Sequence, residues 1–254
     1  MRVTARSSRP LQAYRLAYPR AVGPRRLLIA NVRPHGANAL SAKEDPAAPA
    51  FWDTRFRDKR TPWDAAATPP ELERYLAQES GGGRVLIPGC GSAYEVRTFS
   101  EKNYEVAAID FSVAAVQRAG EILGVLRDAV MLGDFFSYDF GGKPFDIIYE
   151  RAFLASLPRA IWPQYARRVA ELLRPGGRLI GFFVYGEQQG GPPFCLQAGE
   201  LFGLLSDKFE RTAEAAVTAS VPVFKGKERW EIWTRMRPQG PNHGVQPTLA
   251  TGRG

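Results

Sequence analysis

The feature that most constrains this chain is an alternation of short apolar runs with amphipathic stretches, which begins near residue 84. Short strands that alternate with helices form a parallel sheet with helices packed on both of its faces. We therefore predict an α/β fold with parallel strands at residues 85–87, 105–109, 129–132, 145–149 and 179–185.

The stretches between these runs carry helix signals. Ser112 is a good N-cap, and the helix that it opens places Val116, Ala119 and Leu123 on one face. Residues 159–173 form a second amphipathic stretch, which ends at an Arg-Pro-Gly-Gly sequence. Shorter helices are expected at residues 51–56, 71–78 and 200–205.

The last two predicted strands, residues 211–218 and 229–236, have no helix between them. Strands joined without a crossover helix pair in antiparallel fashion. A dinucleotide-binding domain would instead continue with further crossovers. We expect seven strands in total, mostly parallel, with this antiparallel hairpin at the end.

The net charge of +8 comes from the two ends of the chain. Residues 1–43 hold eight Arg and one Lys with no acid, whereas residues 44–234 hold 22 cations against 26 acids. This distribution argues against a basic nucleic-acid-binding face on the folded part. We predict a basic, disordered extension at residues 1–46, a domain at 47–236 and a disordered tail at 237–254. A transit peptide, a loose arm and a misplaced translation start all fit the extension.

The cysteine and apolar content of the chain indicate its cellular compartment. Cys90 and Cys195 are too few for a disulfide framework, and no apolar run is long enough to span a bilayer. A cytoplasmic monomer is the simplest expectation. The two histidines, His35 and His243, fall in the terminal segments, so we expect neither a histidine-based triad nor a metal site in the domain.

A glycine turn follows the first predicted strand, in the sequence Val-Leu-Ile-Pro-Gly-Cys-Gly-Ser at residues 85–92. Gly89 and Gly91, with Cys90 between them, would let the backbone approach a ligand closely, and a helix N-terminus behind them would favour an anionic group. An ordinary tight turn is the alternative explanation.

Asp110 ends the second predicted strand, 19 residues after Gly91. This separation is close to that at which an acid accepts hydrogen bonds from both hydroxyl groups of an adenosine ribose. The alternative is that Asp110 caps the following helix, a role for which Ser112 is better placed.

Two features distinguish this site from a dinucleotide site. The third glycine of the dinucleotide motif is missing, because Tyr94 occupies its place. Asp134 follows the third strand and could accept a hydrogen bond from an adenine amino group, with the Phe135 backbone nearby. A loop acid that is merely solvated would look the same in the sequence.

Five segments, in order, resemble the thiopurine S-methyltransferase family, including its bacterial branch and its plant halide and thiol methyltransferase branch. They are Phe-Trp-Asp at 51–53 with Arg-Thr-Pro-Trp-Asp at 60–64, Leu-Ile-Pro-Gly-Cys-Gly at 86–91, Phe-Asp-Ile-Ile-Tyr-Glu-Arg at 145–151, Leu-Arg-Pro-Gly-Gly at 173–177 and Gly-Gly-Pro-Pro-Phe at 190–194. The similarity covers about residues 51–235. It implies a class I, Rossmann-like methyltransferase fold with S-adenosylmethionine as cofactor.

The resemblance also implies roles for individual residues. The family places aromatic side chains over the cofactor, and cations such as a sulfonium are attracted to aromatic faces. The residues that would bind the cofactor are Trp52, Phe56, Trp63, Gly89, Cys90, Gly91, Asp110, Asp134, Phe135 and Arg151. Arg151 would lie between cofactor and acceptor and, with Tyr185, would take part in catalysis. Plant halide methyltransferases are expected to have tyrosine in place of Arg151, which favours a thiol acceptor over a halide.

Three functions remain open from the sequence. The first is methyl transfer to a small soft nucleophile such as a thiol, sulfide or halide. The second is an NAD(P)-dependent oxidoreductase that uses the same glycine turn and acid. The third is a nucleic-acid-binding protein that uses its basic ends.

Overall fold

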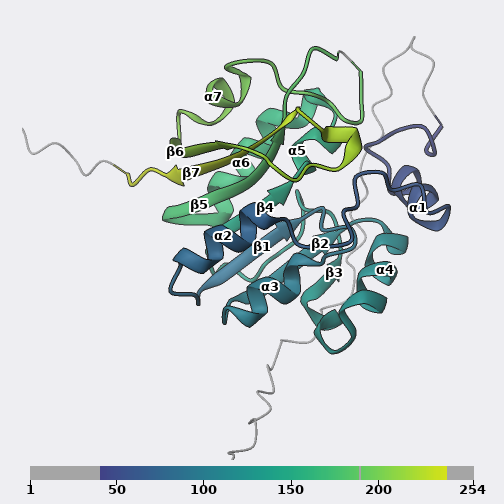
Figure 1. Cartoon of the computed structure of the whole chain (residues 1–254), viewed down its shortest axis with the longest axis horizontal. Coiled ribbons are helices and arrows are strands. Elements are labelled where there is room, and N and C mark those ends of the chain that lie inside the picture. Colours follow the sequence, from purple (N-terminus) through teal and green to yellow (C-terminus); the bar gives the residue numbers. More distant parts are fainter. Residues whose placement is uncertain (1–40, 189, 239–254) are drawn as a thin grey trace, which may run out of the picture. The chain divides into compact units, whose positions relative to one another are not determined.

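The computed structural model describes residues 41–188 and 190–238, and its centre is a seven-stranded sheet (Figure 1). The strand order is β3-β2-β1-β4-β5-β7-β6. The strands are β1 (Arg84–Pro88), β2 (Glu105–Asp110), β3 (Val130–Leu132), β4 (Phe145–Arg151), β5 (Leu173–Val184), β6 (Phe209–Ala216) and β7 (Glu228–Arg235).

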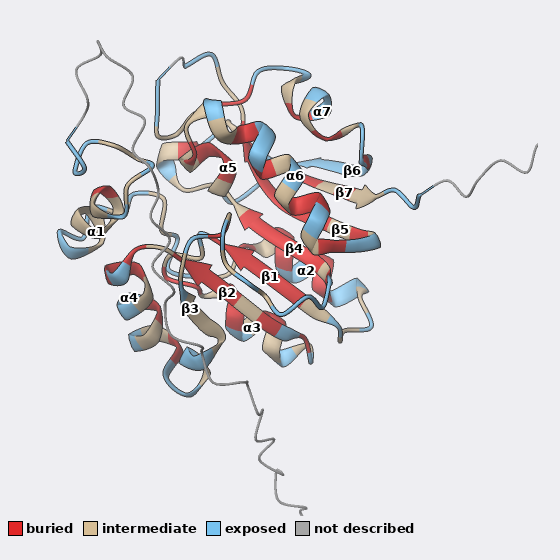
Figure 2. Ribbon diagram, turned by 180° about the vertical axis from the view of Figure 1, so that it is seen from behind, coloured by how far each residue is buried: buried red, intermediate tan, exposed pale blue. Residues whose placement is uncertain are grey.

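Strands β1 to β5 are parallel, as predicted. Val85 pairs with Val106 of β2 on one side and with Ile147 of β4 on the other, so β1 lies at the centre of the parallel part. Buried residues are concentrated on β1, β2, β4 and β5 (Figure 2). Because these strands are parallel, all their carboxyl ends meet at one edge of the sheet.

Strand β5 is longer than predicted and starts at Leu173 instead of residue 179. Leu173 pairs with Phe145, but the next pair joins Arg178 to Ile147, so the Pro-Gly-Gly sequence bulges out of the ladder. Gly176 has a φ of +76° in this bulge, a conformation that glycine adopts without strain. The Arg-Pro-Gly-Gly sequence does end the preceding helix, and it also begins the strand.

The predicted antiparallel hairpin is confirmed. Strand β7 pairs antiparallel with β5 and with β6, so it lies between them. The short 3-10 helix η3 (Pro222–Phe224) lies in the connection between β6 and β7. Trp230 and Trp233 of β7 are buried on opposite faces of the sheet.

Helices cover both faces of the sheet. The helices are α1 (Pro49–Arg57), α2 (Pro70–Gln78), α3 (Glu95–Glu101), α4 (Val113–Leu123), α5 (Phe153–Ser156), α6 (Trp162–Leu172) and α7 (Glu200–Leu205), with η1 (Gly124–Ala129) and η2 (Arg159–Ile161) as further 3-10 turns. Ser112 is the N-cap of α4, since its Oγ accepts a hydrogen bond from the Ala115 N–H at 3.1 Å. The predicted helix at residues 159–173 is divided between η2 and α6.

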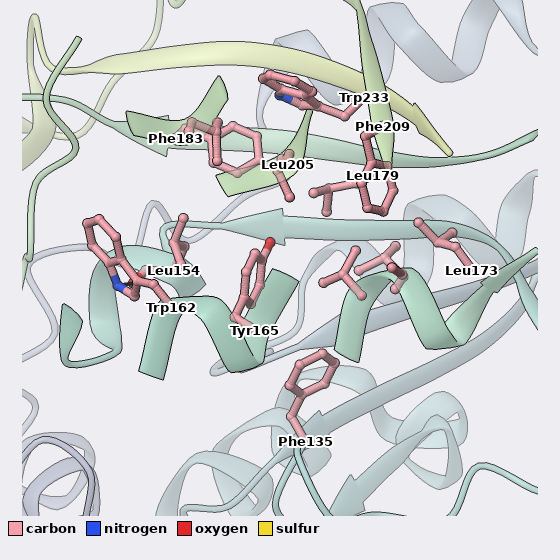
Figure 3. Close-up of a cluster of buried hydrophobic side chains, with 14 of the residues drawn as sticks. Phe135, Leu154, Trp162, Tyr165, Leu173, Leu179, Phe183, Leu205, Phe209 and Trp233 are labelled. Carbon is pink, nitrogen blue, oxygen red and sulfur yellow. Dashed lines mark hydrogen bonds between the residues drawn. The ribbon is translucent and has the colours of Figure 1, made fainter. Parts of the chain in front are cut away.

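Two apolar clusters fix these helices to the sheet. One cluster joins α2, α3 and α4 to side chains such as Val85 and Ile87 of β1. The other joins α5, α6 and α7 to the opposite face, to which Leu86 belongs. Figure 3 shows side chains of this second cluster, among them Tyr165 of α6 and Phe183 of β5. Burial of each large side chain stabilises the fold by about 1.5–3 kcal/mol. Because successive side chains of β1 point to opposite faces, β1 contributes to both clusters and helps to hold helices on both faces.

Candidate active site

A cavity of about 1030 Å³ opens at the carboxyl ends of the parallel strands. Its lining includes residues that follow or end four of them: Gly89 and Gly91, Asp110, Asp134 and Arg151. Ligands of open α/β sheets bind at this edge. The volume lies at the upper end of the range for small-molecule sites, so it can hold more than one ligand.

The cavity has two ends, which differ in the segments that line them. The β2 end is lined by residues that follow β1, β2 and β3, including Gly91, Asp110 and Asp134. The β5 end is lined by Pro192 and Pro193 from the segment after β5, and by Val223 and Phe224 in and beside η3. The β2 end therefore carries carboxylates, whereas these four side chains of the β5 end are apolar.

The glycine turn takes the conformation that the sequence predicts. Gly89 and Gly91 have φ values of +55° and +52°. A Cβ atom at residue 89 would lie 2.3 Å from Cδ2 of Phe153, so a side chain at this position would collide with that ring. Cys90 lies between the glycines but is not part of the cavity wall: its N–H donates to the Ile109 carbonyl at 3.1 Å, and its side chain packs against the cluster under α2 and α3.

Asp110 links the turn to the next strand. Its Oδ2 accepts a hydrogen bond from the Gly91 N–H at 3.0 Å, and its Oδ1 accepts one from the Ser112 N–H at 2.9 Å. The residue is only 8% exposed, and burial raises the pKa of its carboxyl from 3.8 to about 6. A carboxylate has about four acceptor positions, so each oxygen keeps capacity for a ligand hydroxyl.

Three aromatic side chains form a wall of the cavity. Trp63 makes edge-to-face contacts with Trp52 and Phe56, with ring centroids 5.5 Å and 6.2 Å apart. Trp63 also packs against the apolar cluster that contains Phe224, so it connects the aromatic wall to the β5 end. The structure thus brings together the three aromatic residues that the family resemblance assigned to the cofactor.

Asp53, in the same helix as Trp52 and Phe56, binds the start of helix α4. Its Oδ1 accepts hydrogen bonds from the Ser112 hydroxyl at 2.7 Å and from the Ala114 N–H at 3.0 Å. Because Ala114 is in the first turn of α4, Asp53 acts as a second cap of that helix. Helices α1 and α4 accordingly lie side by side (Figure 1).

Asp134 and Phe135 follow β3 and both line the cavity. Asp134 is exposed, and its oxygens accept from the Phe136 N–H at 3.1 Å and the Ser137 hydroxyl at 3.0 Å. Asp134 therefore stabilises its own turn, whatever else it binds. Phe135 is buried, with its ring centroid 5.4 Å from that of Phe153.

Arg151 ends β4 and lines the cavity, as expected. Its guanidinium lies 5.4 Å from the ring centroid of Phe182, and its Nε is 3.8 Å from Oε1 of Glu228. The arginine therefore points along the sheet face toward β7 as well as into the cavity.

Tyr185, to which the family resemblance gives a part in catalysis, does not lie at the cavity. Tyr185 is absent from the cavity lining, and its hydroxyl donates a hydrogen bond to the buried carboxylate of Glu231. The physical reason is strand alternation: Tyr185 shares the face of Phe183, which packs against α5, α6 and α7, whereas Arg151 lies on the opposite face beside Phe182.

Sequence reasoning missed two residues that shape the site. Phe153 fills the space under Gly89, and Glu150 accepts a hydrogen bond from the Leu154 N–H at 2.8 Å, which holds the turn before Phe153. Burial raises the pKa of Glu150 from 4.5 to about 8. The available signal for Glu150 was its place directly after the apolar residues Ile147, Ile148 and Tyr149 of a predicted strand.

Comparison with known proteins decides the family. The family model described as thiopurine S-methyltransferase matches residues 47–236. The chain belongs to the thiopurine S-methyltransferase family. A probable thiol methyltransferase 2 of Arabidopsis thaliana is 30% identical to this methyltransferase over 191 residues, which cover 72% of this chain and 84% of that protein. Thiocyanate methyltransferase 1 of the same plant is 27% identical, covering 80% of this chain and 95% of that protein.

Solved structures place the methyltransferase in the class I fold. A 1,6-didemethyltoxoflavin-N1-methyltransferase of Burkholderia thailandensis aligns with a TM-score of 0.63 at 19% identity, over 80% of this chain and 94% of that one. A magnesium protoporphyrin IX methyltransferase of Synechocystis aligns with a TM-score of 0.60 at 15% identity, over 79% and 100%. The oxidoreductase alternative is not supported.

The cofactor of this methyltransferase is S-adenosylmethionine, and the residues present fit it. The buried Asp110 can accept from ribose hydroxyls, the turn leaves no room for a side chain at Gly89, and the aromatic wall suits a sulfonium cation. Within residues 41–188 and 190–238, no cluster of three or more potential metal ligands occurs. In the same part of the chain, no helix has the length and apolarity needed to cross a membrane.

Proposed function

We propose that this methyltransferase acts on a small thiol that reacts as its thiolate. The observation that carries the proposal is the composition of the cavity wall. Among the described residues, its titratable side chains are three arginines and two aspartates, with no histidine, lysine, tyrosine or cysteine. The names of the relatives, which include thiol, thiocyanate and thiopurine methyltransferases, support a sulfur acceptor.

The donor would occupy the β2 end of the cavity. We propose that Asp110 accepts from the ribose hydroxyls, that the backbone from Gly89 to Gly91 approaches the donor, and that Asp134 and the Phe135 backbone contact the adenine. Trp52, Phe56 and Trp63 would cover the donor. Cys90 would contribute only through its backbone, because its side chain points into the core.

The acceptor would occupy the β5 end, between Phe153 and the apolar side chains of Pro192, Pro193, Val223 and Phe224. Arg151 is the charged group that we place at the boundary between donor and acceptor. A guanidinium at this position would attract an anionic acceptor and would not remove a proton from it.

The wall composition sets the chemistry that the chain must supply. S-adenosylmethionine, when bound, supplies an electrophilic methyl group on a positively charged sulfur. A thiolate is already nucleophilic, so the protein needs no general base and has to align the acceptor and exclude water. The apolar β5 end and the aromatic wall would align the acceptor and exclude water. Exclusion of water favours the reaction because reactants of opposite charge combine more readily in a dry site than in water.

Sulfide and halide ions meet the same requirement, and we propose them as secondary acceptors. We propose that the methyltransferase acts as a monomer. Both Cys90 and Cys195 are free thiols, which supports a cytoplasmic location.

The test is the release of S-adenosylhomocysteine with thiols, sulfide, halides and amines as acceptors. We expect thiols to react fastest and amines not to react. Asp110→Ala should abolish the release at low donor concentration, whereas the exposed Asp139→Ala should not. Turnover of amines but not of thiols would overturn the proposal.

A second measurement tests the absence of a base. At saturating donor, two thiols of different pKa should give pH–rate profiles whose acidic limbs differ by the difference between the thiol pKa values. If both limbs fall at the same pH, a group of the protein removes the proton, and the assignment of a base-free site is wrong.

A further inference from the structure

The side chain of Arg151 is held in an unusual way. Only 13% of it is exposed, its Nε is buried, and this atom has no hydrogen-bond acceptor within the described residues. Arginine is long and loses much conformational freedom when it is fixed in one position. Something other than a hydrogen bond at Nε must therefore orient this guanidinium.

The nearest carboxylate is that of Glu228, at the start of β7. Its side chain is completely buried, and in the part of the chain that the structure describes neither oxygen has a partner at full hydrogen-bond geometry. Burial raises the pKa of this carboxyl, and the nearby Ser220 side chain and the Arg151 charge oppose that rise. Its Oε1 lies 3.8 Å from Nε of Arg151, too far for a hydrogen bond but close enough for a strong ionic attraction.

Glu228 and Arg151 reach each other across strand β5. Glu228 pairs with Val184 of β5, and Arg151 pairs with Phe182 of the same strand. Both side chains lie on the face that carries Phe182 and Trp230, and the guanidinium is near the Phe182 ring. The contact therefore depends on strands that are far apart in the sequence.

Other ionisable groups face Arg151 from neighbouring elements. Glu95 of α3 and Tyr149 of β4 are both buried, and they hydrogen-bond to each other at 3.1 Å. Burial raises the pKa of both, and Arg151 opposes both rises. Glu95 is thus already engaged by Tyr149. Glu228 forms its ion pair with Arg151, and the charge of Glu71 also acts on it.

A completely buried carboxylate whose oxygens lack well-formed hydrogen bonds is costly, and such groups are rare unless they have a function. We propose that Glu228 is a positioning residue: it holds the Arg151 guanidinium from behind, so that the other guanidinium nitrogens face the cavity. Glu228 touches neither donor nor acceptor. The inference rests on the proposed function only in that Arg151 contacts a bound molecule.

The primary test requires no ligand. The Nε–H signal of Arg151, assigned with Arg151→Lys, can be followed by ¹⁵N NMR relaxation in the full chain. In wild type we expect the order of a fixed side chain, and in Glu228→Gln the order of a freely moving arginine. Unchanged order in Glu228→Gln would overturn the proposal.

The second test is a double-mutant cycle on the dissociation constant of S-adenosylhomocysteine and on the KM and kcat for a thiol. Glu228→Gln should change the same constants as Arg151→Ala, in the same direction, by about tenfold. The double variant should be no weaker than Arg151→Ala alone, since Glu228 acts through Arg151. Additive losses, or an Arg151→Ala variant with wild-type constants, would contradict the inference.

Glu231→Gln is the matched control. Glu231 is equally buried on the same strand but points to the other face, where Tyr185 and Trp233 are its donors. If its thermal stability equals that of Glu228→Gln, Glu231→Gln should leave the NMR order of the Arg151 side chain, the dissociation constant, KM and kcat unchanged. A change like that in Glu228→Gln would show that loss of any buried charge on β7 has the same effect, and would contradict the proposal. If no thiol reacts, the proposed function fails, whereas the NMR test still decides the role of Glu228.

Discussion

The Asp110 carboxylate of β2 accepts a hydrogen bond from the Gly91 N–H of the turn after β1, at 3.0 Å. The acid and the glycine turn, which are 19 residues apart in the sequence, therefore form one unit. Binding of a ligand to the Asp110 oxygens therefore depends on the position of the glycine turn, because the turn holds the carboxylate in place.

Cofactor affinity should depend on pH through Asp110. Its pKa in the folded protein is about 6, so the carboxylate is ionised above this pH and protonated below it. Because the ionised form is the better acceptor for ribose hydroxyls, the dissociation constant of S-adenosylhomocysteine should be constant above about pH 7 and rise by up to about tenfold per unit below pH 6. Titration calorimetry between pH 5 and 8 measures this.

Asp110→Asn should bind S-adenosylhomocysteine about tenfold or more weakly at pH 7.5, and with no dependence on pH in this range. Asp139→Asn, in an exposed loop, is the control and should behave as wild type. A pH dependence that persists in Asp110→Asn would assign the titration to another group.

Gly89→Ala should destabilise the protein by several kcal/mol, because alanine at φ +55° is strained and its Cβ would collide with Phe153. Gly82→Ala provides the comparison: it also has a positive φ, +82°, but nothing lies within 4 Å of a Cβ there. Chemical denaturation should show a loss of only about 1 kcal/mol for Gly82→Ala. Equal losses in the two variants would remove the role assigned to Phe153.

Trp63→Ala should weaken binding of S-adenosylmethionine more than binding of S-adenosylhomocysteine. Only the former carries a sulfonium charge, and a cation–π contact contributes about 0.5–2 kcal/mol. The ratio of the two dissociation constants, measured by calorimetry, isolates this term from general loss of packing. An unchanged ratio would place the sulfonium away from this ring.

Glu150→Gln should become more stable relative to wild type as the pH rises. Between pH 4.5 and about 8 the unfolded chain has an ionised Glu150, whereas the buried carboxyl of the folded protein stays protonated, so wild type loses about 1.4 kcal/mol per pH unit from this group. Urea denaturation of both proteins from pH 4 to 9 measures the difference. A difference that does not change with pH would show that Glu150 ionises normally in the fold.

Tyr185→Phe should leave KM, kcat and cofactor affinity unchanged, because its hydroxyl binds Glu231 outside the cavity. The free energy of unfolding should fall by about 1–2 kcal/mol, since a buried carboxylate loses a donor. A tenfold loss of kcat/KM without loss of stability would return Tyr185 to the active site.

The sheet could be predicted from local signals. Apolar runs and the Ser112 cap give β1, β2, β4 and α4 to within a residue or two at most ends, and the missing crossover helix gives the antiparallel hairpin. The start of β5 could not be predicted, because a Pro-Gly-Gly sequence within a ladder depends on the partner strand β4.

The place of a residue at the cavity was predictable where the residue ends its own strand, as Asp110 and Arg151 do. Tyr185 was misplaced because successive side chains of a strand point to opposite faces of the sheet. The sequence indicates where the strand ends but not to which face its last side chains point. Glu228 and Glu150 were missed because the sequence does not show whether an acidic side chain is buried or exposed to solvent in the folded protein.

The Ala114 N–H in the first turn of α4 donates to Asp53, which lies 61 positions earlier in the sequence. Opening of the aromatic wall at α1 would therefore leave the start of α4 without this acceptor, so the two regions must loosen together. Amide hydrogen exchange at Ala114 thus reports, from outside the cavity, whether its cover is closed.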